Sequence, residues 1–356
     1  MHTSKTGLKI MIMLLLATFI LAACGGATST TAPAAPAATS ASGAAPAGGE
    51  ILIGLITKTE TNPFFVKMKE GATKEAEAQG AKLMTAAGKF DGDNEGQVTA
   101  IENMVNAGVK GILITPSNTQ AIVPAIEKAR AAGVMVIALD TPTDPQSATD
   151  ALFATDNFKA GVFIGQYAKA AMAGKPAKIA TLDLGPGITV GILRHNGFLS
   201  GFGVTVDPNA TDLVTDPQVV CSQDTAGDQA KGQTAMENCL QKNPDINLVY
   251  TINEPAAMGA FTALKAAGKE KDVLIVSVDG GCAGVRAVKD GMIGATSQQY
   301  PLKMASEGVK AVVNFAKNGT KVSGYTDTGV TLISDKALAG ADSKDTVFGL
   351  ENCWGE

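Results

Sequence analysis

Polar side chains recur where predicted β-strands end, and their types define the chemistry that the chain can offer. A carboxylate accepts hydrogen bonds, a guanidinium donates them and an amide does both, so a mixed set can satisfy a neutral ligand rich in hydroxyl groups. Neighbouring aromatic rings can cover the C–H face of a sugar. A phosphate or carboxylate ligand would instead require a surplus of Lys, Arg and helix N-termini. The candidate binding residues are Lys58, Asn62, Phe64, Phe65, Asp140, Thr155, Asp156, Arg194, Asn253, Asp279 and Gln299.

Each of these residues also has a structural interpretation. An Asp or Asn such as Asp156 can cap a helix or fill a turn, and Phe64 or Phe65 can belong to the core of the first helix. In open α/β sheets, however, ligands bind outside the carboxyl ends of the strands. The recurrence of polar residues at these ends therefore favours one shared cleft.

The motifs of catalysis and of nucleotide binding are missing or poorly formed in the sequence. It contains no GxSxG and no GxxxxGK[ST] segment, and Gly185, Gly187 and Gly191 follow a GxGxxxG spacing that includes Pro186. This spacing is a weak signal for a nucleotide loop. His195 is the only His after position 2, so a hydrolase triad is not expected. We expect a binding protein that is not an enzyme and needs no cofactor.

One acidic segment has the spacing of a calcium-binding loop. Asp91 to Glu102 places oxygen ligands at EF-hand-like positions, and such a loop must stay irregular to its twelfth residue. The apolar spacing over 98–105 predicts a helix instead, with Asp93 or Asn94 as its N-cap. No CxxC pair is present for zinc. We therefore expect no metal site.

The elements that must hold these side chains alternate between short apolar runs and longer amphipathic stretches. The predicted strands are 51–56, 82–86, 111–115, 134–139, 152–154, 178–182, a weak strand before Cys221, 248–251, 273–278 and 294–296. The predicted helices include 64–79, 95–106, 120–132, 158–172, 236–241 and 302–317. This βα alternation predicts an α/β fold with parallel sheets, and its length suits two doubly wound lobes.

The first 49 residues have a different composition from the rest, with no Asp or Glu before Glu50. Two Lys residues precede an apolar run over 10–23 that is too short to span a membrane, which indicates an export signal over 1–23. Residues 21–24 read Leu-Ala-Ala-Cys, which resembles the bacterial lipobox and predicts a lipid on Cys24. The alternative is an ordinary signal peptide that ends near a Cys. Residues 24–49 are mainly Ala, Gly, Pro, Ser and Thr, and this composition predicts a flexible linker.

Four further cysteines form an even set in a chain predicted to leave the cytoplasm. They are Cys221, Cys239, Cys282 and Cys353. Three pairings are possible, and the sequence leaves all three open. Pairing Cys221 with Cys239 would close a short loop across one strand–helix unit. It would leave Cys282 with Cys353, which would hold the C-terminal tail against the body.

The body resembles the type I periplasmic binding proteins of ABC sugar importers, most of all the branch for fructose and ribose. The matching segments appear in the family's order at 61–65, 114–117, 138–142, 153–157, 194–198, 252–254, 277–280 and 299–301. The resemblance covers nearly the whole body. It implies an exported, lipid-anchored monomer that binds a monosaccharide between two lobes and presents it to an ABC transporter permease.

The resemblance also implies roles for residues of the first lobe. Asn62, Phe64 and Phe65 match the first loop, where an amide and two aromatic rings meet the sugar. Asp140 matches the carboxylate that accepts sugar hydroxyls after the fourth strand. Thr141 departs from the pattern, because ribose binders usually carry Arg at this position. The departure puts ribose in doubt and favours fructose.

In the second lobe, the family's Arg falls on Arg194, with His195 as a competitor for the same role. The family's remaining polar contacts fall on Asn253, Asp279 and Gln299. Thr155 and Asp156 lie at the first of three interdomain crossings, near 155, 299 and 328. The resemblance thus implies lobes of 50–155 plus 300–328 and of 156–299 plus 329–356, joined by a three-strand hinge that lets them close on the sugar.

Four other interpretations compete with a fructose importer. The ligand can be another pentose, hexose or cyclitol. A sugar sensor or chemoreceptor subunit differs only in its partner. The ligand core of a transcription repressor shares the fold, but the export signal and the missing helix-turn-helix oppose it. An exported sugar enzyme lacks a base–nucleophile pair. The net charge of -5 and the absence of a basic block also exclude a nucleic-acid partner.

Overall fold

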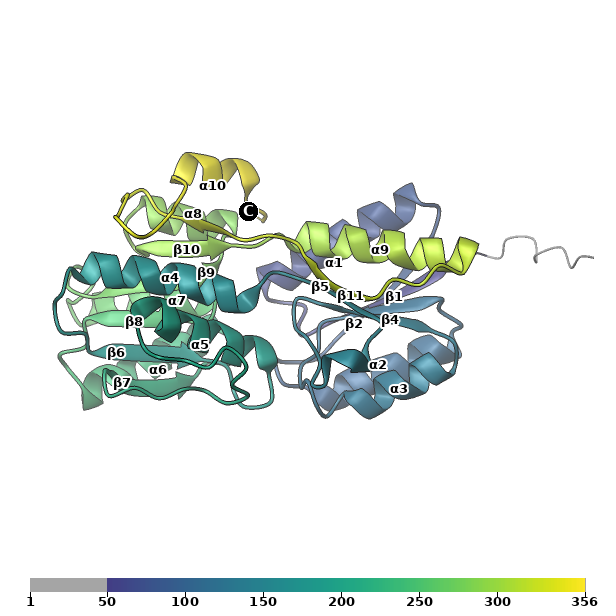
Figure 1. Ribbon diagram of the computed structural model, residues 1–356, viewed down its shortest axis with the longest axis horizontal. Helices are drawn as coiled ribbons and strands as arrows, with labels where there is room; N and C mark the ends of the chain where they lie inside the picture. Colours follow the sequence, from purple (N-terminus) through teal and green to yellow (C-terminus); the bar gives the residue numbers. More distant parts are fainter. Residues whose placement is uncertain (1–49, 356) are drawn as a thin grey trace, which may run out of the picture. The chain divides into compact units, whose positions relative to one another are not determined.

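A computed structural model describes residues 50–355, so the predicted export signal, the linker and Cys24 lie outside the described residues. The body contains two six-stranded sheets (Figure 1). The first sheet has the order β11-β5-β4-β3-β1-β2, and its neighbours all pair in parallel. Its strands are β1 Leu52–Thr57, β2 Lys82–Ala87, β3 Gly111–Ile114, β4 Met135–Leu139, β5 Ala151–Ala154 and β11 Gly324–Asp327.

The second sheet has the order β12-β10-β9-β8-β6-β7. Its strands are β6 Ile179–Asp183, β7 Val219–Asp224, β8 Leu248–Thr251, β9 Leu274–Asp279, β10 Ala295–Gln298 and β12 Thr331–Ile333. The prediction of parallel pairing is wrong for β12, which runs antiparallel to β10. The reason is that β11 ends at the carboxyl edge of the first sheet and only a short connection separates it from β12, so β12 starts at the carboxyl ends of the second sheet's strands and runs opposite to them. The chain leaves the first sheet at its carboxyl end and enters the second from that same end.

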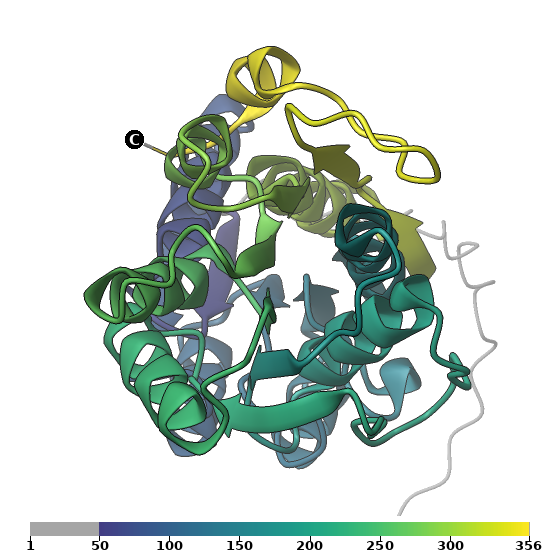
Figure 2. The same ribbon diagram turned by 90° about the vertical axis from the view of Figure 1, so that its left-hand side faces the viewer.

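Helices cover both faces of each sheet (Figure 1 and Figure 2), as the sequence pattern predicts. The first lobe contains α1 Pro63–Ala78, α2 Asn94–Asn106, the 3-10 helix Gln146–Ala148, α3 Val123–Ala131 and α9 Pro301–Asn318. The second contains α4 Asn157–Met172, α5 Thr189–Phe202, α6 Gln229–Lys242, α7 Glu254–Ala266, α8 Cys282–Lys289 and α10 Thr346–Asn352. Helix α6 begins earlier than predicted, because the Asp228 carboxylate caps it.

The core follows from the alternation of side chains along the strands. Leu55 packs in the cluster beneath α1 and α9, whereas the next residue, Ile56, packs in the cluster beneath α2 and α3. Helices α1 and α9 lie side by side over the first sheet although they are far apart in the sequence (Figure 1). These two lobes of helix-covered, largely parallel sheets confirm the predicted fold class.

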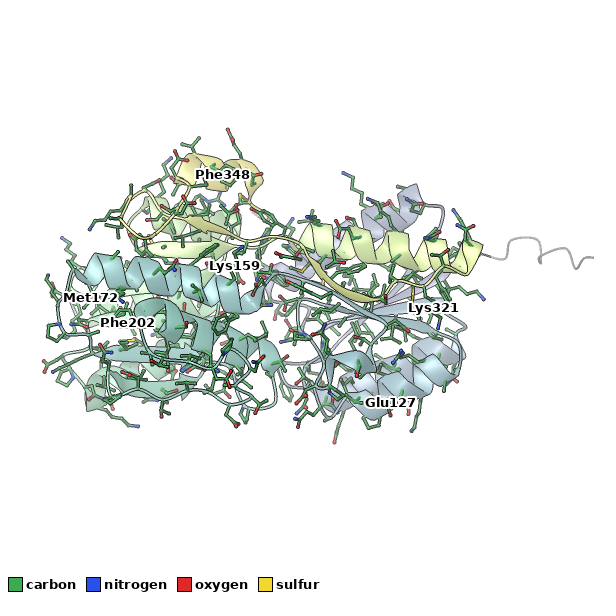
Figure 3. The ribbon with its side chains drawn as sticks, viewed as in Figure 1. Glu127, Lys159, Met172, Phe202, Lys321 and Phe348 are labelled. Atoms are coloured by element: carbon green, nitrogen blue, oxygen red, sulfur yellow. A yellow bond between two sulfur atoms is a disulfide. The ribbon has the colours of Figure 1, made fainter. Side chains whose placement is uncertain are left out.

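Helices α4 and α5 of the second lobe approach each other closely because glycines face the contact. A Cβ atom on Gly161 would overlap the carbonyl oxygen of Arg194, and one on Gly165 would overlap that of Phe198. Met172 and Phe202, at the ends of the two helices (Figure 3), share one buried cluster. The close packing fixes α5, and with it Arg194, against the start of α4.

The chain passes between the sheets three times: from β5 to α4, from β10 to α9 and from β11 to β12. Two disulfides join Cys221 to Cys239 and Cys282 to Cys353, which selects one of the three pairings that the sequence leaves open. Within residues 50–355, no helix has the length and apolar character that crossing a membrane requires.

Candidate functional site

Three buried charged side chains meet where strands of both sheets end. Asp140 follows β4 of the first sheet, Asp279 ends β9 of the second, and Arg194 lies on α5. The Arg194 Nη2 atom is 3.5 Å from Asp140 Oδ1, and its Nη1 atom is 3.7 Å from Asp279 Oδ1. The guanidinium also donates to Asn157 Oδ1 at 2.8 Å and to the carbonyl oxygen of Ile252 at 3.0 Å. One cation is thus fixed between a carboxylate from each lobe.

Both aspartates have a backbone conformation that is rare outside glycine. The φ angle is 61° at Asp140 and 145° at Asp279. The Asn157 side chain donates to the Asp140 carbonyl oxygen at 3.0 Å, and the Gln299 backbone N–H donates to the Asp279 carbonyl oxygen at 2.9 Å. These two hydrogen bonds hold the backbone at Asp140 and at Asp279. Such positive φ values cost energy and cluster at binding and catalytic sites. The strain therefore marks these two positions as functional candidates.

The cluster contains acceptor atoms with unused capacity. The Gln299 amide donates to Asp279 Oδ1 at 2.9 Å, and the Thr141 hydroxyl donates to Asp140 Oδ2 at 2.9 Å. Asp140 Oδ1 and Gln299 Oε1 are buried and have no hydrogen-bond partner among the described residues. Because an unsatisfied buried acceptor is costly, these oxygens are well suited to receive hydroxyl groups of a ligand.

A third buried acid, Glu254, lies beside Asp279. Its carboxylate accepts from the backbone N–H groups of Gly280 at 2.8 Å and Gly281 at 3.0 Å and from the Thr296 hydroxyl at 2.8 Å. Burial and the neighbouring charge of Asp279 raise the pKa of Glu254 to about 8. Burial also raises the pKa of Asp279 to about 6, against the opposing charge of Arg194. Glu254 was not among the predicted binding residues, although it directly follows Asn253 at the end of β8.

A cleft of about 730 Å³ opens between these elements. Its lining includes Asn62 and Phe65 from the first lobe and Glu254 and Asp279 from the second. The volume lies within the range of roughly 300–1,000 Å³ that is usual for small-molecule sites. The cleft can therefore hold a small ligand that contacts both lobes.

Aromatic rings form one wall of this region. Asn62 caps α1, since its Oδ1 accepts from the Phe64 backbone N–H at 3.0 Å. The Phe64 ring packs edge-on against Phe65 and against Trp354, with 5.4 Å between the ring centroids in both pairs. Phe64 and Phe65 belong to the first-lobe core cluster, and Phe65 also lines the cleft. Trp354 was not predicted here, because nothing in its local sequence links it to the first loop.

Three other predicted residues use their polar atoms within the protein. Asp156 caps α4, and Asn253 caps α7 while its amide donates to the Gly227 carbonyl oxygen at 2.9 Å. The Thr155 hydroxyl donates to the Gly329 carbonyl oxygen at 3.2 Å, where two of the crossings meet. The helix-cap interpretation thus describes Asp156 and Asn253.

His195, the competitor of Arg194, faces a different environment. Its Nδ1 is 2.8 Å from Asp183 Oδ1, and its Nε2 is 2.9 Å from the Val214 carbonyl oxygen. Burial alone would lower the pKa of His195, but the hydrogen bond and the charge of Asp183 outweigh it and raise the pKa. Arg194, and not His195, contacts the aspartates of the cluster.

Lys58 is buried, and its Nζ is 3.6 Å from Asp91 Oδ1. Burial raises the pKa of Asp91. The acidic segment that follows is helical: Asp93 caps α2, and Glu102 lies exposed within that helix. A loop of EF-hand type is therefore not formed. Within 50–355, no group of three or more His, Cys, Asp or Glu residues is arranged to hold a metal ion.

Comparison with known proteins agrees with this geometry. The family model of the periplasmic binding protein domain matches residues 53–321. The ribose import binding protein of Bacillus subtilis is 35% identical over 271 residues, which cover 75% of this chain and 83% of that protein. The D-allose-binding periplasmic protein of Escherichia coli is 28% identical over 271 residues, covering 74% and 84%.

Solved structures agree as well. A galactofuranose binding protein superposes with a TM-score of 0.73 at 27% identity, covering 85% of this chain and 97% of that one. A solute binding protein from Actinobacillus succinogenes with bound D-allose has a TM-score of 0.70 at 26% identity, covering 80% and 98%. These relatives are transport binding proteins and not enzymes. The chain belongs to the periplasmic binding protein domain family, as a type I sugar-binding protein of the ABC transporter class.

Proposed function

We propose that this protein binds one neutral monosaccharide in the cleft between its lobes and presents it to the permease of an ABC importer. The observation that carries the proposal is the cluster in which Arg194 lies between Asp140 and Asp279. A site with two carboxylates and one guanidinium carries a net negative charge and is rich in hydrogen-bond acceptors. Such a site suits the hydroxyl groups of a neutral ligand and disfavours an anionic ligand. The relatives named above, for ribose and allose, support the same ligand class.

Fructose is our favoured ligand, with ribose and allose as its main competitors. Thr141 favours fructose, because its short side chain donates to Asp140 and adds no second cation beside that carboxylate. The names of the relatives support ribose and allose instead. We further propose that the sugar is held by Asn62, Phe65 and Asp279, which line the cleft, and by Asp140, Arg194 and Gln299 of the charged cluster, to which Asp279 also belongs. Phe64 completes the proposed set, because its ring packs against Phe65 and Trp354 of the cleft wall.

The test is isothermal titration calorimetry with D-fructose, D-ribose, D-allose, D-mannose, D-xylose and myo-inositol, paired with thermal unfolding. Binding at one site per chain should raise the melting temperature, because a ligand that binds only the folded state stabilises it. If D-ribose or D-allose binds most tightly, fructose is wrong as the ligand, whereas the proposed class of neutral monosaccharides stands. An absence of heat and of thermal shift with all six compounds would reject the proposal.

We also propose that the body is a monomer attached to the outer face of the cytoplasmic membrane by a lipid on Cys24. The lobes would comprise 50–155 plus 300–328 and 156–299 plus 329–356, a division supported by the sheets to which β5, β11 and β12 belong. Metabolic labelling with a radioactive fatty acid tests the anchor. The label should enter the full-length wild-type chain and be absent from the Cys24→Ser variant. Equal membrane attachment of the wild-type and Cys24→Ser proteins would contradict the proposed lipid anchor on Cys24.

A further inference from the structure

The only Trp of the chain, Trp354, lies beside the candidate site although it is carried by the far end of the sequence. It follows α10, which packs on α8 in the second lobe. Its ring nevertheless belongs to the hydrophobic cluster of the first lobe and is only 6% exposed. Trp354 thus links the two lobes next to the cleft that both of them line.

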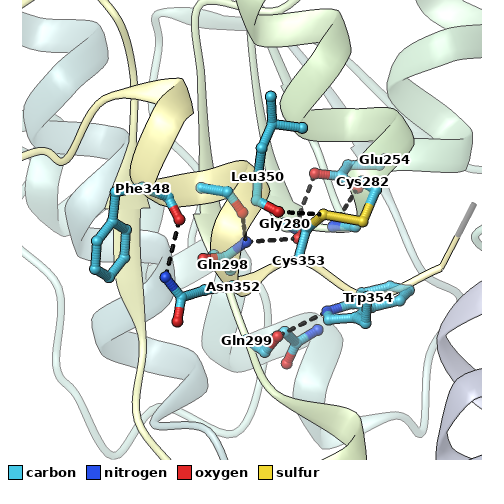
Figure 4. Close-up of a disulfide and its surroundings, with 12 residues drawn as sticks. Glu254, Gly280, Cys282, Gln298, Gln299, Phe348, Leu350, Asn352, Cys353 and Trp354 are labelled. Atoms are coloured by element: carbon cyan, nitrogen blue, oxygen red, sulfur yellow. Dashed lines mark hydrogen bonds between the residues drawn. A yellow bond between two sulfur atoms is a disulfide. The ribbon is translucent and has the colours of Figure 1, made fainter.

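Three contacts fix Trp354 in this place. The indole N–H donates to the Gln299 carbonyl oxygen at 2.8 Å (Figure 4), and the ring packs edge-on against Phe64 with 5.4 Å between the ring centroids. The Trp354 carbonyl oxygen accepts from the Cys282 backbone N–H at 3.0 Å. Phe64 and Gln299 are both proposed sugar contacts, and Gln299 also lies at the second crossing between the lobes.

The disulfide between Cys282 and Cys353 secures this arrangement. Cys282 begins α8 directly after Gly281, whose backbone N–H is held by the Glu254 carboxylate beside Asp279. The bond therefore ties the residue before Trp354 to the turn that follows β9. An apolar ring beside a Phe, together with a backbone hydrogen bond to Gln299, restricts both groups to one geometry.

We infer that the Cys282–Cys353 disulfide and Trp354 form a positioning element of the sugar site. This element sets the ring of Phe64 and the backbone of Gln299 in the orientation that the sugar requires. The inference rests on the proposed function, since it concerns the same cleft. It assigns the tail a role in affinity in addition to any role in stability.

The second disulfide offers a matched control. Cys221 lies in β7 and Cys239 in α6, and both belong to a core cluster of the second lobe that contains none of the proposed sugar contacts. The variant Cys282→Ser/Cys353→Ser is therefore compared with Cys221→Ser/Cys239→Ser. Each removes one disulfide and leaves the other in place, and far-ultraviolet circular dichroism checks that both variants are folded.

Two measurements test the inference. Calorimetric titration with D-fructose, D-ribose and D-allose should show binding at least tenfold weaker in the tail variant, and within about threefold of wild type in the control variant. Quenching of Trp fluorescence by acrylamide, measured without sugar, should increase in the tail variant only. Because Trp354 is the only Trp, this signal reports its release directly.

Each outcome has a defined meaning. Unchanged affinity or unchanged quenching in the tail variant overturns the inference, and so does an equal loss of affinity in both variants. If the tail variant does not fold, Trp354→Phe decides, because it keeps a ring against Phe64 but loses the donor to Gln299. Binding weakened by about threefold to tenfold supports the inference, and unchanged binding overturns it. A wild-type protein that binds none of the sugars refutes the proposed function itself.

Discussion

Replacing Asp140 by Asn tests whether the charged cluster is the sugar site. The substitution keeps the shape of the side chain and removes its charge, while Arg194 retains its second partner, Asp279. The variant should therefore fold, with an unfolding free energy lowered by no more than about 1–3 kcal/mol. The affinity for the sugar should also fall, because a carboxylate acceptor becomes a neutral amide.

The magnitude follows from the geometry of the cluster. At the 3.5 Å between Arg194 Nη2 and Asp140 Oδ1, the Coulomb attraction is about 5 kcal/mol at an effective dielectric constant of about 20. Desolvation of both groups offsets most of this value. What the ligand loses is a charge-assisted hydrogen bond, worth about 1.5–3 kcal/mol, so the dissociation constant should rise about 10- to 150-fold.

Asp156→Asn provides the matched control for Asp140→Asn. Asp156 was also a predicted site residue, but its carboxylate caps α4, and Asn caps a helix about as well as Asp. Calorimetry should therefore give a dissociation constant within about twofold of wild type for this variant. Binding by Asp140→Asn within threefold of wild type, or an equal loss in both variants, would refute the assignment of the site.

Two further predictions concern the supports of the site. Gly161→Ala places a methyl group against the Arg194 carbonyl oxygen. Urea unfolding should show a loss of about 1–3 kcal/mol in the unfolding free energy, and calorimetry should show weaker sugar binding. Gln166→Ala, on the exposed face of the same helix, is the control and should change neither quantity in this way. Glu254, with its pKa raised to about 8, keeps a proton that the unfolded chain releases above about pH 4.5. Asp279, with its pKa raised to about 6, adds a slope of the same sign below pH 6, so the contribution of Glu254 is measured between pH 6 and 8, where stability should fall by up to about 1.4 kcal/mol per unit on its account. Glu254→Gln should flatten this slope and the exposed Glu127→Gln should not; equal slopes in all three proteins would contradict the raised pKa.

The strand and helix pattern could be predicted from the sequence because it depends on local periodicity. Alternating apolar residues such as Leu55 and Ile56 locate a strand that is buried on both faces. The direction of β12 could not be predicted in this way. It is set by the short connection from β11 and by the facing carboxyl ends of the two sheets, which are properties of the assembled fold.

The candidate site could be predicted only as a set of residue types. Asp140 and Asp156 both follow strands of the first sheet, and sequence alone does not distinguish a carboxylate that caps a helix from one that faces a ligand. The structure separates them by backbone conformation, since Asp140 has a φ angle of 61° and Asp156 one of -66°. Trp354 and Glu254 escaped prediction because their roles depend on contacts between distant segments.

The charged cluster also has a consequence for how a ligand would bind. Arg194, carried by the second lobe, contacts an acid at the end of a strand in each sheet, so this side chain joins the two lobes. A sugar hydroxyl that binds Asp140 Oδ1 competes with Arg194 for the same acceptor. The observed affinity is then the difference between the new hydrogen bonds and the interlobe contacts that they replace.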